Sequence, residues 1–375
     1  MPDRNWSHLL DVPAFPPERY AKLADRLAAL MKTQNDVLLI QAEAVLALEA
    51  VATSLARPGV KALNIVTSPY GAWFGDWLKR GGSDVINLVA EPGRTIAIEA
   101  VHQQLDEHPD IAVLSLVHAE SATGILNPLE DIVGLARERG VLTVVDAVAS
   151  IGGHALNVDE QGIDIVVIGP QKSLAGPAGI SAISVSDRAW EMLQHGGAPR
   201  NSMLSLLDQK EQWLDSGRGA LPGTPAPLEF FALDAALERL EAEGIDSVQA
   251  RHRLAARATR EAVVALGVEL WVTDELASAL VTAVKLPADI DRSDLLQAAR
   301  LDGADIGAAV GPGSDRLIRL NHTGRRASKK AVIANIQALA QALEFQGNST
   351  PAVEALVVVD TLYSSTAAKQ TNPSV

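Results

Sequence analysis

Short apolar runs alternate with helical patterns through the first half of the chain, and this alternation constrains the fold more than any other feature. Amphipathic helical patterns lie between most of the apolar runs, as at Leu46–Leu55, Thr95–Glu107 and Asp131–Gly140. Such alternation is typical of a parallel sheet with helices on both faces, so we expect an α/β fold with a mainly parallel sheet. The predicted strands are Val37–Ile40, Ala62–Val66, Val85–Val89, Ala112–Val117, Leu142–Asp146, Ile163–Gly169 and Ile180–Val185.

The 375 residues exceed what one compact core usually holds, which predicts more than one domain. We expect an N-terminal arm and a large domain over residues 1–247, and a smaller C-terminal α/β domain over 248–346. Its predicted helices are Ser247–Leu266, Ser293–Leu301 and Ser328–Phe345, and its predicted strands are Val268–Val272, Ala279–Leu286 and Leu317–Leu320. The tail over 347–375 has one apolar patch among small polar residues, and we expect it to be poorly ordered or docked locally.

Charge and cysteine content exclude several classes of function. The net charge of −14 argues against nucleic acid and anionic membranes as partners, because both attract basic surfaces. The absence of cysteine excludes disulfides and thiolate metal sites, and no metal site is predicted. The N-terminal residues lack the apolar core of a signal peptide, and no apolar run is long enough to span a membrane, so we expect a cytoplasmic location.

One strand-to-helix joint has an unusual composition. The apolar run Val37–Ile40 is followed by Gln41, Ala42 and Glu43, and then by the helix-forming run Ala44–Ala50. A helix N-terminus after a strand commonly binds an anion through its free N–H groups. Here the joint carries its own carboxylate, which argues against an ordinary phosphate site. The simpler interpretation is that Glu43 only complements the helix dipole.

Asp146 and Lys172 each follow a predicted buried strand, at the edge where parallel sheets bind ligands. A carboxylate and an amine at that edge suit a pyridine ring. The carboxylate would keep the ring nitrogen protonated, and the amine would form an imine with the ring's aldehyde. Taken singly, such an Asp is more often a cap or turn residue, and such a Lys is usually solvated.

Four segments resemble the class V aminotransferases of fold type I, in particular the alanine–glyoxylate and serine–glyoxylate group. They are HAESATGILNPL, VVDAVASIGG, GIDIVVIGPQKSLAGPAGISAISVS and IRLNHTG, and the resemblance covers most of residues 30–345. It implies Lys172 as the Schiff-base lysine and Asp146 as the partner of the pyridine nitrogen. The remaining roles that it implies are Tyr70 stacked on the ring, Ser121 near the phenolic oxygen, Gln171 beside Lys172, and Arg319 on the substrate carboxylate.

The chain departs from this family where the cofactor phosphate is held. The family's hydroxyl-bearing turn falls on Glu43, Ala44 and Val45, and a tyrosine that neighbouring subunits supply is replaced by Leu221, three residues before Thr224. At about 4 Å, each unit of charge repulsion between Glu43 and a phosphate would cost roughly 4 kcal/mol at an effective dielectric near 20. We therefore expect no tightly bound cofactor, with pyridoxamine and pyridoxal as substrate and product. The alternative is pyridoxal 5′-phosphate as cofactor.

A branch of the same group carries a glutamate in this turn and uses pyridoxamine as substrate. That resemblance implies transfer of the amino group of unphosphorylated pyridoxamine to pyruvate, giving pyridoxal and L-alanine. Val310 stands where that branch has a second arginine, so Arg316, Arg325 or Arg326 could replace it, or the keto acid could differ. The competing hypotheses are an ordinary alanine/serine–glyoxylate aminotransferase and a catalytically silent vitamin B6-binding protein. The family also implies a homodimer or homotetramer, in which Thr224 would reach a neighbour's site.

Overall fold

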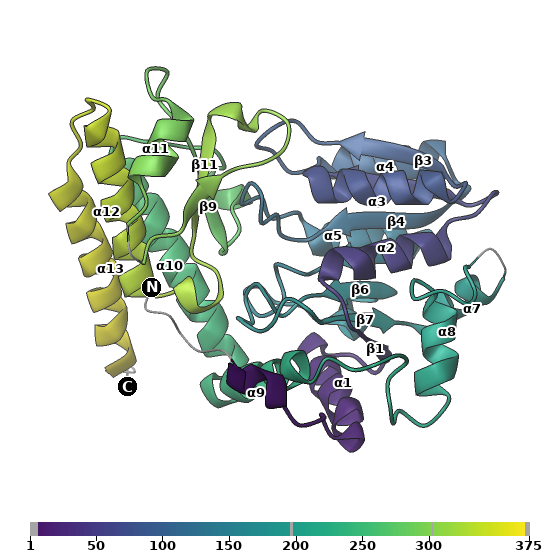
Figure 1. The fold of residues 1–375 in the computed structure, drawn as a ribbon. Coiled ribbons are helices and arrows are strands. Elements are labelled where there is room, and N and C mark those ends of the chain that lie inside the picture. Colours follow the sequence, from purple (N-terminus) through teal and green to yellow (C-terminus); the bar gives the residue numbers. More distant parts are fainter. Residues whose placement is uncertain (1–6, 196–197, 302, 372–375) are drawn as a thin grey trace.

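The computed structural model describes residues 7–195, 198–301 and 303–371, and it confirms the predicted α/β architecture with a mainly parallel sheet (Figure 1). The large sheet has the strand order β1-β7-β6-β5-β4-β2-β3. Its strands are β1 (Asp36–Ile40), β2 (Lys61–Val66), β3 (Asp84–Val89), β4 (Ile111–Val117), β5 (Leu142–Asp146), β6 (Ile165–Ile168) and β7 (Ser181–Val185). Strand β7 runs antiparallel to both of its neighbours, and the other strand pairs are parallel.

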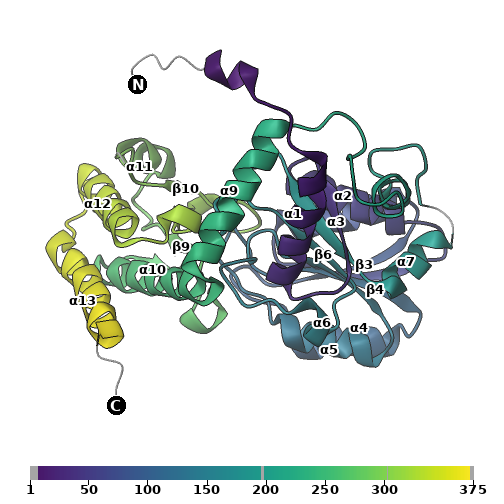
Figure 2. The same ribbon diagram turned by 90° about the horizontal axis from the view of Figure 1, so that it is seen from below.

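Helices cover both faces of the large sheet, so its central strands are largely buried. Figure 2 shows α2 and α3 on one face and α4, α5 and α6 on the other. This burial explains why the central strands have continuous apolar runs rather than alternating patterns. The helices of this part are α1 (Pro17–Met31), α2 (Ala44–Leu55), α3 (Pro69–Arg80), α4 (Ile98–Glu107), α5 (Leu129–Glu138), α6 (Val158–Gln161), α7 (Asp187–Gln194), α8 (Leu206–Gln209) and α9 (Pro227–Glu243).

A second, four-stranded sheet lies beside the first, with the order β10-β11-β9-β8 and all pairs antiparallel. Its strands are β8 (Glu269–Leu270), β9 (Val281–Lys285), β10 (Ile306–Ala308) and β11 (Leu317–Asn321), and its helices are α10 (Ile245–Ala265), α11 (Arg292–Ala298) and α12 (Lys329–Phe345). The proposed division after residue 247 falls within α10, and the domain bounds stay a prediction. No helix among the described residues is both long and apolar enough to cross a membrane.

The tail contains a helix that the sequence patterns did not predict. Helix α13 (Ala352–Thr371) packs against α10 and α12, which it flanks in Figure 1. Its apolar residues Ala355, Val359 and Leu362 join the core of the second sheet and its helices. The outer ends of the predicted arm and tail, residues 1–6 and 372–375, lie outside the described residues.

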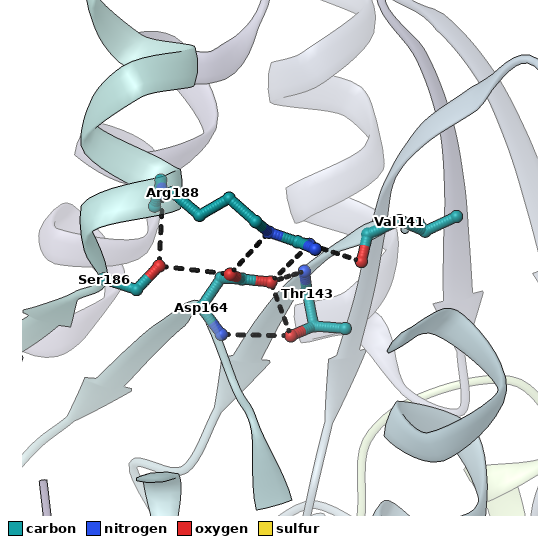
Figure 3. A network of polar contacts seen from close by, with 6 residues as sticks. Val141, Thr143, Asp164, Ser186 and Arg188 are labelled. Atoms are coloured by element: carbon teal, nitrogen blue, oxygen red, sulfur yellow. Dashed lines mark hydrogen bonds and ion pairs between the residues drawn. The ribbon is translucent and has the colours of Figure 1, made fainter. Parts of the chain in front are cut away.

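A polar network fixes the strands at the sheet edge where β5 and β6 begin (Figure 3). Asp164 is 7% exposed, and its Oδ2 accepts hydrogen bonds from Thr143 N at 2.9 Å and from Arg188 Nη2 at 2.9 Å. Its Oδ1 accepts from Ser186 Oγ and Arg188 Nε, each at 3.1 Å. Arg188 also donates to Val141 O at 2.8 Å, so one carboxylate joins the ends of β5, β6 and β7.

Replacing Asp164 with alanine should lower the free energy of unfolding by about 2–3 kcal/mol, because it leaves several buried donors without an acceptor. The exposed Arg188 guanidinium keeps the loss at the lower end of the range for buried pairs. Urea unfolding measures this loss in the free energy of unfolding. The matched control is Asp187→Ala, which removes an exposed carboxylate in the first turn of α7. The control should lose less than about 1 kcal/mol, and equal losses would show that the network is not what stabilises this edge.

Candidate functional site

A cavity of about 330 Å³ opens at the carboxyl ends of β4 and β5, the sheet edge opposite the Asp164 network. It brings together seven of the residues that the sequence singled out: Glu43, Ala44, Val45, Tyr70, Ser121, Asp146 and Lys172. A second cavity of about 370 Å³, between the two sheets, shares Ser121 and Lys172 with the first. Gln171 and Arg319 line that second cavity, so nine of the ten candidate residues line two cavities that share part of their walls.

Asp146 is the last residue of β5, and its side chain is half-buried in the first cavity. Its Oδ1 accepts a hydrogen bond from Val148 N at 2.9 Å, which holds the carboxylate at the strand end. Burial raises the pKa of Asp146 to about 6, against the opposing effects of the Val148 hydrogen bond and the Lys172 charge. A cationic partner, such as a protonated ring nitrogen, would therefore be bound strongly by this carboxylate.

Lys172 lies in the loop after β6 and lines both cavities. Burial lowers its pKa, and the nearby positive charge of Arg319 lowers it further, while Glu43 and Asp146 oppose the shift. Its amine is therefore available as a free base at a lower pH than that of an ordinary lysine. Because Lys172 lines both cavities, its free amine can act on a ligand in one cavity and on a substrate in the other.

Glu43 caps α2 from the joint that the sequence singled out. Its Oε2 accepts a hydrogen bond from Val45 N at 2.9 Å, and its Oε1 accepts from Gln171 Nε2 at 2.8 Å. Both oxygens are thus engaged, and the side chain remains exposed to solvent. Glu43 lines the first cavity, where a phosphate would approach the N-terminus of α2.

Aromatic side chains form one wall of the first cavity. Tyr70 is in the first turn of α3, where Ser68 Oγ accepts a hydrogen bond from Tyr70 N. The ring of Trp73 lies edge-on to the ring of Tyr70, with centroids 5.5 Å apart. The wall can therefore stack on a flat ligand.

Arg319 lies on β11 of the second sheet, and its side chain extends to the loop that follows β4 of the large sheet. Its Nη1 donates a hydrogen bond to Ser121 O at 2.5 Å, which leaves the rest of the guanidinium in the second cavity. The other candidate arginines differ in their partners. Arg316 donates to Ile290 O. Arg325 and Arg326 both line the second cavity with Arg319, but Arg326 pairs with Asp305 whereas Arg325 is exposed.

Thr224 is the one candidate residue that the structure does not bring to either cavity. Its segment is fixed to the joint before α2, because Gln41 Oε1 accepts from Ala226 N at 2.9 Å and Gln41 Nε2 donates to Pro222 O at 3.3 Å. Thr224 itself is exposed within the single chain. Its role stays a prediction that concerns a second subunit.

Two further residues with polar or aromatic side chains, Trp73 and Glu120, line the first cavity and were not predicted from the sequence. Trp73 follows Tyr70 by three residues on a helix, and this spacing places both rings on one face. Glu120 is 0% exposed although it carries a carboxyl group. Its position inside the quoted HAESATG segment, directly after a buried strand, was the available signal.

Comparison with known proteins agrees with this geometry. Residues 18–325 match the family described as Aminotransferase class-V. The pyridoxamine–pyruvate transaminase of Mesorhizobium japonicum is 36% identical over 331 residues, which cover 88% of this chain and 84% of that protein. The crystal structure of pyridoxamine–pyruvate aminotransferase from Mesorhizobium loti is similar with a TM-score of 0.87 and 33% identity, covering 93% of this chain and 89% of that one. Alanine–glyoxylate aminotransferase of Callithrix jacchus is 29% identical over 328 residues, which cover 86% of this chain and 79% of that protein.

These matches correct one expectation from the sequence. Class V aminotransferases use bound pyridoxal phosphate, so the expectation of no tightly bound cofactor is wrong, and pyridoxal 5′-phosphate, the stated alternative, replaces it. The expectation rested on repulsion between Glu43 and a phosphate at an effective dielectric near 20, together with the missing tyrosine. The structure places Glu43 in solvent, where each unit repulsion at about 4 Å is worth only about 1 kcal/mol. The residues present fit the cofactor's ring, since Asp146, Lys172 and Tyr70 line one cavity.

Proposed function

The chain belongs to the class V aminotransferases, and we propose that it transfers the amino group of pyridoxamine to pyruvate, giving pyridoxal and L-alanine. The observation that carries this proposal is Glu43 at the N-terminus of α2, in the same cavity as Lys172 and Asp146. A carboxylate at this position can accept a hydrogen bond from the hydroxymethyl group of pyridoxamine. Pyridoxamine and pyridoxal phosphate share the pyridine ring, so the same ring-facing residues would hold either.

Each residue has a distinct task in the proposed reaction. When bound, the vitamer ring supplies an electron sink. Asp146 keeps the ring nitrogen protonated, and Tyr70 stacks on the ring. After the vitamer amine has joined the carbonyl carbon of the keto acid with loss of water, Lys172 Nζ takes a proton from the aminomethyl carbon of the vitamer and delivers it to the former carbonyl carbon. Addition of water then releases pyridoxal and L-alanine. The position of Lys172 between the two cavities supports this proton transfer, since the vitamer would occupy one and the keto acid the other.

Arg319 holds the carboxylate of the keto acid, since a planar guanidinium suits a bidentate pair with a carboxylate. Arg325 is the candidate second contact, because Arg316 and Arg326 are engaged with Ile290 O and Asp305. Ser121 and Gln171 complete the proposed site, near the phenolic oxygen of the ring and beside Lys172. Ala44 and Val45 line the cavity next to Glu43.

In this proposal the chain works in the cytoplasm, as a homodimer or homotetramer, in vitamin B6 degradation. The exposed Thr224, which the Gln41 hydrogen bonds hold close to the joint before α2, supports a site that a neighbouring subunit completes. Size-exclusion chromatography with light scattering measures the assembly. A monomer with full activity would show that Thr224 of a neighbouring subunit is not part of the site.

The purified chain should convert pyridoxamine and pyruvate to pyridoxal, measured by the absorbance of pyridoxal, in a panel that includes glyoxylate as acceptor and alanine and serine as donors. Faster turnover of alanine or serine with glyoxylate than of pyridoxamine with pyruvate would favour the alternative, an ordinary alanine/serine–glyoxylate aminotransferase. That alternative is supported by the likeness to alanine–glyoxylate aminotransferase.

Replacing Glu43 with glutamine should shift substrate preference toward pyridoxamine 5′-phosphate. Two phosphate charges near one exposed carboxylate cost about 2 kcal/mol in total, so removing that charge should change the kcat/KM ratio of the two vitamers by about tenfold or more. Glu49→Gln, which makes the same change on the same helix away from the cavity, is the matched control. A ratio that moves equally in both variants, or in neither, would show that Glu43 does not select the vitamer.

A further inference from the structure

Glu120 is a buried carboxyl group of the first cavity that the proposed reaction does not use. It follows β4, is 0% exposed, and lines the cavity together with Asp146 and Lys172. Its Oε2 has no hydrogen-bond partner within the described part of the chain. A buried polar atom without a partner, on a residue that lines a ligand cavity, calls for an explanation, and a partner supplied by the ligand is one.

The hydrogen bonds around Glu120 have a fixed direction. Asn127 Nδ2 donates to Val117 O at 2.8 Å, and because a carbonyl only accepts, this end of the Asn127 amide must be the NH₂ group. The same Nδ2 donates to Thr67 Oγ1 at 2.8 Å, so the Thr67 hydroxyl hydrogen is free to point to Glu120 Oε1. With the Thr67 hydroxyl donating to Oε1, Oε2 is the oxygen of this carboxyl that remains for a proton.

The surroundings favour the protonated form of Glu120. Burial raises its pKa to about 7, the charge of Asp146 raises it as well, and the hydroxyls of Ser68 and Thr67 oppose the shift. Two carboxyl groups in one cavity do not ionise independently, and one of them keeps its proton more readily. The other titratable groups that face this cavity are Glu43 from α2, Tyr70 from α3, Asp146 from β5 and Lys172 from the loop after β6, and buried His118 lies two residues before Glu120.

We propose that Glu120 binds the vitamer as a neutral carboxylic acid, donating a hydrogen bond from Oε2 to an acceptor on the ring ligand and leaving Asp146 to carry the negative charge at the ring nitrogen. This inference rests on the proposed function, since it assumes a pyridine-ring ligand in the cavity. It assigns opposite protonation states to two neighbouring carboxyls. Ionisation of Glu120 would add a second negative charge and remove the donor.

The test measures binding of 4-deoxypyridoxine, a ring ligand that lacks the amine and aldehyde and so cannot react with Lys172. Glu120→Gln keeps an acceptor for Thr67 and a donor at the Oε2 position, and it does not titrate. The ratio of the wild-type Kd to the Glu120→Gln Kd should rise about tenfold from pH 6 to pH 8, as expected for loss of a proton with a pKa of about 7. Glutamine at the exposed Glu130 of α5 is the matched control and should give a constant ratio.

A ratio that stays constant between pH 6 and pH 8 would overturn the inference, and so would a glutamine variant that binds ten times more weakly than wild type at pH 6. If the variant does not fold, the protonation of Glu120 is tested in the wild type. The measurement is an infrared difference spectrum at pH 8, ligand-bound minus free. It should show the gain of a protonated carboxyl band, and its absence would overturn the inference. A wild type that binds the ring but does not form pyridoxal would count against the proposed function alone.

Discussion

Replacing Lys172 with alanine is expected to lower kcat for amino transfer by at least about 10³-fold, because the variant lacks the base that moves the proton between the two carbons. Burial and the charge of Arg319 lower the pKa of this amine, which makes it an effective base near neutral pH. The KM for pyridoxamine should change far less than kcat. Stopped-flow absorbance of pyridoxal formation measures both quantities.

Two controls separate chemistry from structure in the Lys172 experiment. Alanine at Lys330, an exposed lysine on α12, should leave kcat within about twofold of wild type. Small primary amines added to Lys172→Ala should restore part of the lost rate, since they can enter the space that the side chain leaves. Retention of more than a tenth of the wild-type rate would show that another group moves the proton.

Replacing Asp146 with asparagine is expected to lower kcat/KM by about 10²–10³-fold, because a neutral amide cannot hold the proton on the ring nitrogen. The same change should not destabilise the unliganded chain. The pKa of Asp146 in the fold, about 6, lies above its ordinary value, so ionisation costs stability that grows as pH rises from about 4 to about 6 and stays constant above. At pH 7.5 the variant should be at least as stable as wild type, by up to about 3 kcal/mol.

Asp146→Asn is thus expected to lose activity without losing stability. Steady-state kinetics and urea unfolding on the same preparations test the two expectations. Asp76→Asn, an exposed change on α3, is the matched control and should alter neither quantity. A variant that loses activity and stability together would indicate that Asp146 supports the strand end rather than the ring. Wild-type activity in a well-folded Asp146→Asn variant would show that the reaction does not need the Asp146 carboxylate.

The large sheet could be predicted from the sequence because its strands are buried on both faces. Every residue of β6 and β7 is buried, so the apolar runs are continuous and stand out from the helical patterns. The reversed direction of β7 could not be predicted, because a buried strand has the same composition in either direction. Helix α13 was missed because its apolar residues pack against α10, far earlier in the chain, as well as against the preceding α12, and because they lie amid small polar residues typical of loose tails.

The site could be predicted where a residue type and a strand end coincide. Asp146 and Lys172 follow buried strands, and the sheet edge brings them to one cavity. The environment of each side chain could not be predicted in this way. The repulsion between Glu43 and a phosphate was set too high because the exposure of Glu43 is a property of the folded chain. Glu120 was passed over because its burial and its contact with Thr67, 53 residues earlier, arise only in the folded chain.

The central claim is that pyridoxamine is the amino donor. The most direct measurement supplies pyridoxamine labelled with heavy nitrogen at its amino group, together with unlabelled pyruvate, and follows the label by mass spectrometry. The account predicts one labelled L-alanine for each pyridoxal formed, with the label lost when Lys172→Ala replaces the wild type. Unlabelled alanine, or no alanine while alanine and glyoxylate react readily, would contradict it.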